Sequence, residues 1–115
     1  MECILDIESI KINNMRISVN NLMVAQGCAN RVEQISSLIS NILQGKPVAA
    51  ILVSEMENGQ FRVEDGTHRA IAYCLSGREF IDDGNDEFQI VPFNKDRNTM
   101  GSLKNLIVKV LEKKA

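Results

Sequence analysis

The sequence has few aromatic residues: it contains no tryptophan, one tyrosine and four phenylalanines. A buried core must therefore consist mainly of isoleucine, leucine, valine and methionine side chains. Hydrophobic residues make up 44% of the chain and charged residues 24%, which is ordinary for a soluble globular protein. A chain of 115 residues can bury such a core without disulfides, and we expect a single domain over residues 1–115.

Cysteines are also few, and their spacing fits neither a zinc site nor a disulfide framework. Cys3, Cys28 and Cys74 are odd in number, far apart and without a CxxC pair. The lack of a disulfide framework fits a reducing cytosol. No apolar stretch approaches the roughly 18 residues of a membrane span, and no targeting signal is evident. We therefore expect a cytoplasmic protein that does not contact a membrane.

The chain lacks an excess of positive charge. It has 13 lysines and arginines against 15 aspartates and glutamates, which gives a formal net charge of −2. This balance argues against a nucleic-acid-binding surface over the whole domain. The lysines of the last predicted helix are the only support for DNA binding, and at its C-terminal end they also complement the helix dipole. They are Lys104, Lys109, Lys113 and Lys114.

The hydrophobic pattern predicts a mixture of helices and strands. Apolar residues recur at helical spacing over 31–44, 67–76 and 100–113. Strands are expected over 10–12, 15–19, 48–53, 61–63 and 88–93, and loops over 22–29, 82–87 and 94–99. Asn30 is the expected N-cap of the first helix, because Glu33 stands in the capping-box position. The run 48–53 is expected to be buried on both faces of a sheet.

The stretch 63–77 brings together more charged and reactive groups than any other part of the chain. It reads VEDGTHRAIAYCLSG, which predicts the end of a strand, a tight turn at Asp65-Gly66, and a helix. Asn58-Gly59 is a hairpin signal, so a returning strand delivers the chain into this turn. The single histidine, His68, lies at the bend.

Such a turn is suited to an anionic ligand. The first N–H groups of a helix have no partner within the helix, and with the helix dipole they attract anions. Gly66 lets a ligand approach the backbone, and Thr67 and Arg69 offer further hydrogen bonds to phosphate oxygens. Asp65 is suited to hold Mg²⁺ or to accept a proton from a nucleophile. We therefore predict that the turn binds a nucleotide together with a divalent ion.

A purely structural role of the same residues is the alternative. Asp-Gly is a common turn pair, and Asp65 or Thr67 would then simply cap the helix. Arg69 would pair with Glu64 or Asp65. His68 would be a satisfied structural histidine.

The order of these features resembles the ParB/sulfiredoxin superfamily over residues 4–93. The shared pattern is a helix over 30–44, a buried strand over 48–53, a hairpin, and then DG-x-HR-x-x-A at 65–72. The resemblance implies an α/β (α+β) fold in which about three helices pack on a small mixed sheet. It also implies that the glycine turn and the helix N-terminus bind nucleotide phosphates. Members include partition proteins that bind CTP, sulfiredoxins that use ATP, and free serine kinases that use ADP.

Departures from each branch narrow what the resemblance implies. Sulfiredoxins carry a cysteine where this chain has Thr67, so the chain is not expected to be a sulfiredoxin. Partition proteins have a Gly-Glu-Arg-Arg-like turn and a following DNA-binding domain; here Thr67-His68 replaces the Glu-Arg pair, and a DNA-binding domain is not expected. The serine kinase turn matches best, at the residues Asp65, Gly66, His68 and Arg69.

The kinase resemblance assigns roles to further residues. Asp65 would be a phosphoryl-transfer or metal residue. In those kinases a glutamate on the preceding helix is the base, and Glu33 is the candidate here. Arg31 would reach the phosphates from the start of the same helix.

Two functions follow from different classes of protein. The first is a nucleotide-dependent phosphotransferase or nucleotide hydrolase that uses ATP, ADP or CTP with Mg²⁺. In it Asp65, His68 and Glu33 would be catalytic, and Gly66, Thr67, His68, Arg69 and Arg31 would bind the nucleotide. The second is a non-catalytic regulatory module that contacts DNA, a protein partner or a second copy of itself.

Overall fold

A computed structural model of the chain describes residues 15–25 and 31–114, with side chains as far as Glu112. Its helices are α2 (Val32–Leu43), α3 (Thr67–Leu75) and α4 (Leu103–Lys114). Its strands are β1 (Arg16–Ser18), β2 (Leu22–Val24), β3 (Ile51–Glu55), β4 (Phe61–Asp65), β5 (Phe80–Asp82), β6 (Phe88–Ile90) and β7 (Gly101–Ser102). Two short 3₁₀ helices, η1 (Val19–Asn21) and η2 (Asp83–Asn85), complete the described elements. The predicted strand 10–12 lies outside the described residues.

Five strands form a mixed sheet in the order β6-β3-β4-β2-β7. β3 and β4 are the predicted antiparallel hairpin, β2 runs parallel to β4, and β6 runs parallel to β3. β7 pairs antiparallel with β2, while β1 and β5 form a separate two-stranded sheet. β4 therefore occupies the centre of the larger sheet, and its last residue leads into the turn at Asp65-Gly66.

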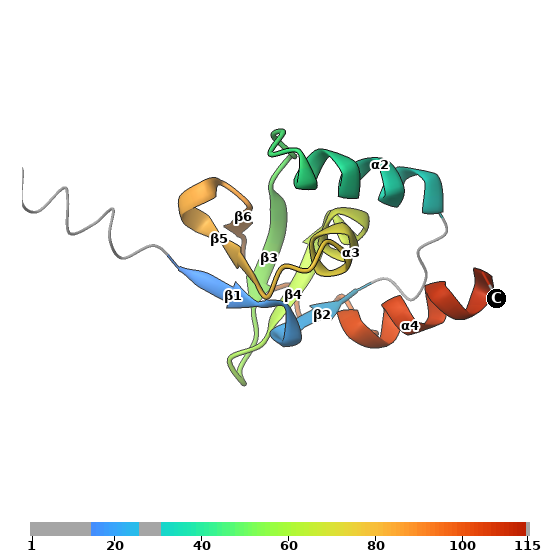
Figure 1. Ribbon diagram of the computed structural model, residues 1–115. Coiled ribbons are helices and arrows are strands. Elements are labelled where there is room, and N and C mark those ends of the chain that lie inside the picture. The colour runs from blue at the N-terminus through green and yellow to red at the C-terminus, as the bar shows by residue number, and fades with distance from the viewer. Residues whose placement is uncertain (1–14, 26–30, 115) are drawn as a thin grey trace, which may run out of the picture.

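The helices pack in layers on one face of this sheet (Figure 1). α3 contacts β3 and β4, α4 contacts β2 and β7, and α2 packs outside against α3. Three helices on a small mixed sheet confirm the predicted α+β fold class. None of the helices in the described part of the chain is long and apolar enough to cross a membrane.

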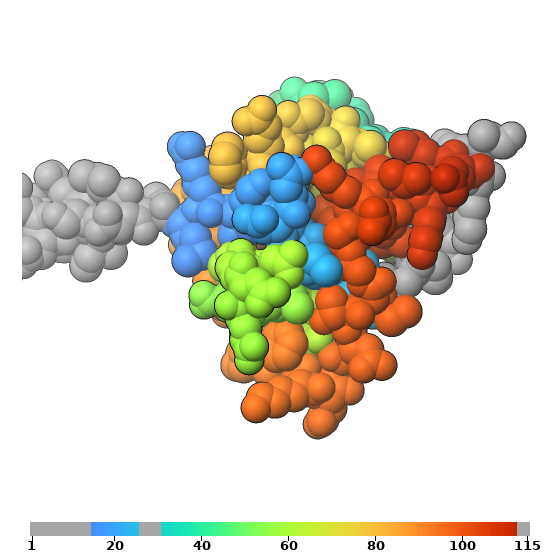
Figure 2. Space-filling model, turned by 90° about the horizontal axis from the view of Figure 1, so that it is seen from below, coloured from blue at the N-terminus to red at the C-terminus, as the bar shows by residue number. Residues whose placement is uncertain are grey.

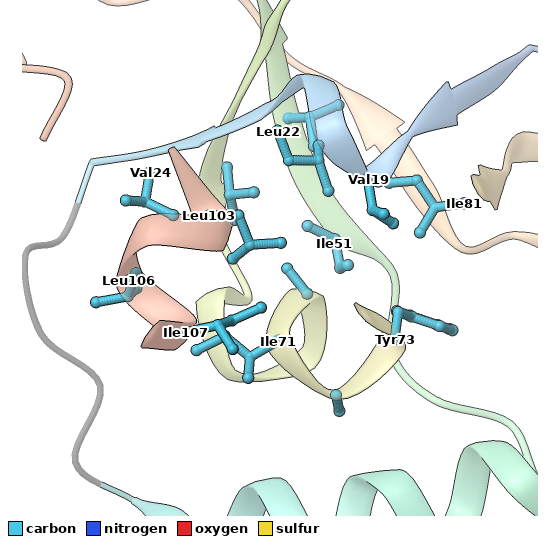
Figure 3. Close-up of a cluster of buried hydrophobic side chains, with 14 of the residues drawn as sticks. Val19, Leu22, Val24, Ile51, Ile71, Tyr73, Ile81, Leu103, Leu106 and Ile107 are labelled. Carbon is cyan, nitrogen blue, oxygen red and sulfur yellow. The ribbon is translucent and has the colours of Figure 1, made fainter. Parts of the chain in front are cut away.

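The core between the sheet and the helices is mainly aliphatic, as the scarcity of aromatic residues predicts (Figure 3). Leu22, Ile51, Ile71, Ile81 and Leu103 are completely inaccessible to solvent. They come from three strands and two helices, so the core joins both sheets to α3 and α4. Burial of each such side chain contributes about 1.5–3 kcal/mol.

The three predicted helices are confirmed, with small changes at their ends. α3 closes as a Schellman motif, because Gly77 has φ +91° and the Arg78 N–H donates to the carbonyl of Tyr73 at 3.2 Å. The expected capping box at α2 is wrong: Arg31 is the N-cap residue, and its side chain makes no capping hydrogen bond. Asn30 lies outside the described residues. In α4, Leu111 is 51% exposed rather than part of the buried face.

Several short strands differ from the sequence prediction. Residues 22–24 belong to β2 rather than to a loop, since Leu22 and Val24 are buried beside β4. Three residues are too few to display a hydrophobic period. β3 begins at Ile51 rather than at Val48, and it extends to Glu55.

The acidic segment 82–87 is more structured than the solvated loop that was expected. It contains the end of β5 and all of η2. Glu87 is 7% exposed, and its Oε1 accepts hydrogen bonds from Arg78 at 2.6 Å and from the Asp82 N–H at 2.7 Å. The acid therefore links this segment to the chain that follows α3.

Candidate functional site

The turn after β4 depends on glycine at position 66. Gly66 adopts the left-handed conformation with φ +97°, which residues with side chains rarely adopt. A Cβ atom at this position would lie 2.9 Å from both Nε and Nη2 of Arg69. Glycine is therefore required both by the backbone conformation and by the guanidinium that lies over it.

The N-terminus of α3 keeps its backbone donors. The Ala70 N–H donates to the Gly66 carbonyl at 2.9 Å, but no described residue accepts a hydrogen bond from the N–H groups of Thr67, His68 or Arg69. No side chain caps the helix, and its first turn holds no acidic residue. The capping role that the sequence allowed for Asp65 or Thr67 is thus not used. Three donors and the positive end of the helix dipole face the turn.

Arg69 ties the turn to the neighbouring backbone. Its Nη1 donates to the Ala50 carbonyl at 2.9 Å, and its Nη2 lies 3.4 Å from Asp65 Oδ2. The Arg69 side chain is 19% exposed, whereas that of Asp65 is 70% exposed. Arg69 therefore pairs with Asp65, as expected if these residues have a structural role. The Asp65 carboxylate nevertheless remains largely open to solvent.

Thr67 and His68 are less exposed than their position at a bend suggests. Thr67 is 5% exposed, so its side chain packs into the protein. His68 Nε2 is buried, and none of the described residues hydrogen-bonds it. Burial lowers the pKa of His68 below its usual value, and the nearby charge of Arg31 lowers it further. The imidazole is therefore neutral at neutral pH, with one buried nitrogen that still requires a partner.

The helices α2 and α3 run in the same direction. Arg31, at the start of α2, lies close enough to His68, in the first turn of α3, to lower its pKa. At the other end Ile42 of α2 and Tyr73 of α3 line one groove of about 440 Å³. The two helices therefore begin on the same side of the molecule, and their dipoles point in the same direction.

Glu33 makes no described contact with the turn. It lies in the first turn of α2, its side chain is exposed, and no described hydrogen bond or ion pair connects it to Asp65 or His68. His68, Arg69 and Asp65 belong to the turn itself, the charge of Arg31 acts on His68, and the role of Glu33 stays a prediction.

Asp65 does not belong to a metal-binding cluster of side chains in the described part of the chain. Among the described residues no group of three or more His, Cys, Asp or Glu side chains is placed to hold a metal ion. A magnesium ion at Asp65 would take its remaining ligands from phosphate oxygens and water, as is common for nucleotide-bound Mg²⁺. The exposed carboxylate fits that arrangement.

β4 carries a bulge immediately before the turn. Leu52 of β3 lies opposite Asp65, whereas the next residue, Val53, lies opposite Val63. Glu64 is therefore an extra residue with no partner in the ladder. Bulges bend the strand and increase its twist, and they often lie next to functional sites.

A buried polar network, which the sequence did not predict, surrounds the Glu64 side chain. Oε2 accepts hydrogen bonds from Ser54 Oγ and, at 2.7 Å, from Arg62 Nε. Ser54 and Arg62 are completely buried. Burial alone would raise the pKa of Glu64, but hydrogen bonds from Arg62 and Ser54 and the charges of Arg62 and Arg97 outweigh it and lower the pKa. The signal in the sequence was the pair of charged residues at 62 and 64, which alternate with the buried Phe61 and Val63.

Arg62 also holds the segment 91–99 against the sheet face that lies away from the helices. Its guanidinium donates to the carbonyls of Arg97 at 2.7 Å and Asn94 at 2.9 Å, and to Thr99 Oγ1 at 3.2 Å. The ring of Phe93 lies 4.2 Å from Arg62 Cζ. Figure 2 shows this orange segment beside the green β3–β4 hairpin.

Comparison with solved structures identifies the fold. Sulfiredoxin from Arabidopsis thaliana matches with a TM-score of 0.56 and 19% sequence identity, over 72% of this chain and 89% of sulfiredoxin. The C-terminally truncated chromosome-partitioning protein ParB from Caulobacter crescentus, complexed with CTP-γ-S, matches with a TM-score of 0.56 and 14% identity. No family model and no curated protein matches the sequence.

The match to ParB covers 87% of this chain and 53% of that structure, so the chain spans about half of its length. At these identities the comparisons concern the fold. The chain has a ParB/sulfiredoxin-like fold, which confirms the resemblance seen in the sequence.

Proposed function

We propose that this protein binds the phosphate groups of a nucleotide at the N-terminus of α3. The observation that carries the proposal is the set of N–H groups of Thr67, His68 and Arg69, for which the described residues supply no acceptor. Such groups at a helix start are a general anion site, and the left-handed Gly66 lets a ligand come close to them. The ParB structure complexed with CTP-γ-S has the same fold and supports the choice of a nucleotide.

The charged residues around these donors suit a phosphate chain. Arg31 contributes positive charge from α2, and Arg69 from α3. His68 Nε2 is the buried nitrogen without a described partner, and a ligand oxygen or a bound water would satisfy it. Asp65 would hold Mg²⁺ beside the phosphates through its exposed carboxylate.

The same turn could also catalyse a reaction of the bound nucleotide. A phosphotransferase or nucleotide hydrolase would use Asp65 as metal ligand or base, and His68 and Arg69 to stabilise developing charge. The role of Glu33 as base rests on the kinase resemblance, because its exposed side chain makes no described contact with Asp65 or His68. A non-catalytic module would use the same turn for binding alone, and the pairing of Asp65 with Arg69 favours that alternative.

The test is thermal stability with ATP, ADP or CTP, each with and without Mg²⁺. A ligand at about 100 times its Kd should stabilise the protein by about 2.7 kcal/mol, so the melting temperature should rise by several degrees. If none of the three nucleotides raises it at millimolar concentration, the proposal is wrong.

Turnover separates the enzyme from the binding module. Phosphate release and ADP formation are measured with the wild type and with Asp65→Asn. In an enzyme Asp65→Asn keeps nucleotide binding but loses turnover. In a binding module the wild type already shows no turnover above a protein-free control.

A further inference from the structure

We infer that Arg97 is a positioning residue for the Asp65-Gly66 turn, an inference that rests on the phosphate site proposed above. Its starting point is the bulge at Glu64, the last residue before the turn. The extra residue of a bulge loses its place in the ladder, so its backbone and side chain need other partners. The contacts that hold the backbone and side chain of Glu64 therefore determine the direction in which Asp65 and Gly66 leave the sheet.

Arg97 supplies partners to both parts of Glu64. Its Nη1 donates to the Glu64 carbonyl at 3.0 Å and lies 3.2 Å from Glu64 Oε1. A single guanidinium thus fixes the peptide unit that joins Glu64 to Asp65. The first free N–H of α3 belongs to Thr67, two residues after Asp65. A rotation of the Glu64–Asp65 peptide would therefore change the direction of the N–H groups at the start of α3.

Arg97 is itself held in place. Its own carbonyl accepts a hydrogen bond from the buried guanidinium of Arg62 at 2.7 Å. Arg62 also donates to Glu64 Oε2, so both ends of Arg97 connect to the same network. The Arg97 side chain is 40% exposed, and it therefore holds the turn from the solvent side.

This arrangement predicts a loss of affinity when Arg97 is removed. Binding groups must be held to within about 0.5 Å for full effect, and side chains behind the site provide that support. In Arg97→Ala the Glu64 carbonyl loses its donor, so the bulge relaxes and the donors at the start of α3 lose their alignment. The protein should still fold, because Arg62, Ser54 and the core are unchanged.

The experiment compares Arg97→Ala with Lys95→Ala by calorimetric titration with ATP and Mg²⁺. Both variants remove one positive charge from the same exposed segment, but no described contact joins Lys95 to Glu64. Arg97→Ala should bind about tenfold more weakly, and Lys95→Ala should stay within about twofold of the wild type. Salt of about 0.5 M screens the interaction of surface charges with the ligand but does not restore the position of the turn. The difference in affinity between the two variants should therefore persist at that salt concentration. Equal losses in both variants, or a difference that salt abolishes, would overturn the inference.

A second measurement does not depend on nucleotide. In ¹H–¹⁵N spectra of the ligand-free protein, the amide signals of residues 66–69 and the His68 ring should move in Arg97→Ala and not in Lys95→Ala. If they move while the wild type binds no nucleotide, the positioning role stands and the proposed function fails. If they do not move, the positioning role is wrong whatever the nucleotide does.

Arg97→Lys covers the case in which the alanine variant does not fold. Lysine keeps the charge, but its ammonium ends one bond nearer the backbone than the Arg97 Nη1 that makes both contacts with Glu64. The amide signals of residues 66–69 should therefore still move away from their wild-type positions in Arg97→Lys. Signals identical to those of the wild type would contradict the positioning role.

Discussion

His68 is the single histidine of the chain, so its titration can be followed without overlap. Burial and the charge of Arg31 lower its pKa from the usual 6.5. The unfolded chain therefore takes up the proton first as the pH falls. The stability contributed by neutral His68 is complete above pH 6.5 and declines as the pH falls from there toward the folded pKa.

We expect the ring protons of His68 to titrate below pH 6.5 in an NMR experiment. In His68→Gln the free energy of unfolding should lose the part of its pH dependence that lies just below pH 6.5. A His68 pKa at or above that of an unstructured histidine would contradict the burial of Nε2.

Gly59 and Gly66 both have a positive φ, but only Gly66 lies against another side chain, which allows a matched comparison. Gly59 has φ +74°, and a Cβ there would meet nothing within 4 Å. Gly66 has φ +97°, and a Cβ there would displace the Arg69 guanidinium. Both alanine variants should lose about 1–2 kcal/mol through backbone strain. Gly66→Ala should lose about 1 kcal/mol more, because the hydrogen bond from Arg69 to Ala50 breaks. Urea denaturation of the two variants measures the difference, and equal losses would show that Arg69 adapts without cost.

At the level of the element, Arg31 lies at the N-terminus of α2, where its positive charge destabilises the helix. A positive charge at a helix N-terminus opposes the dipole and typically costs 0.3–1 kcal/mol. Arg31→Ala should therefore leave the ligand-free protein equally or slightly more stable while weakening nucleotide binding several-fold. Lys46, just beyond the C-terminus of the same helix, is the matched control. Lys46→Ala should lose a little stability and leave nucleotide affinity unchanged; loss of affinity in both variants would mean that the site is not at the N-terminal end.

Two arginine ion pairs on the sheets test how much burial matters. Arg62 is fully buried and joins β4 to the segment 91–99, while Arg16 of β1 is 68% exposed and lies 3.7 Å from Asp82. Arg62→Ala should lower the free energy of unfolding by about 3–5 kcal/mol, because the Glu64 carboxylate loses its buried cation and the carbonyls of Asn94 and Arg97 lose their donor. Arg16→Ala should change it by less than about 1 kcal/mol. The comparison is made by chemical denaturation, and a loss below 1 kcal/mol for Arg62→Ala would mean that water replaces its contacts.

For the whole molecule, the sequence predicted the elements whose signals are local. α3 ends where Gly77 requires it, and the hairpin turns at Asn58-Gly59. The sequence did not predict β2, β5 and β7, because strands of two or three residues are defined by their neighbours in the sheet. Their pairing partners lie far along the chain and leave no periodic pattern.

The sequence likewise predicted only the part of the candidate site whose residues are adjacent in the chain. The turn at 65–69 could be identified because a glycine, a histidine and an arginine stand together in the sequence. The contact of Arg97 with Glu64 behind the turn could not be identified from the sequence. The two residues are distant along the chain, and the bulge at Glu64 depends on the register of β3 and β4. The capping-box prediction for Glu33 failed because the helix begins at Val32, with Arg31 as its N-cap residue.

The shared direction of α2 and α3 has a consequence for how a ligand reaches the protein. Their positive ends lie on the side of Arg31 and His68, and their negative ends lie at the groove that Asp86 and Glu87 line together with Lys46 and Arg78. The two helix dipoles thus point the same way although the net charge of the chain is small. An anion diffusing nearby is drawn toward one pole and turned away from the other before any contact forms. Its rate of association should therefore fall as salt is added, even where the affinity measured at equilibrium depends on hydrogen bonds.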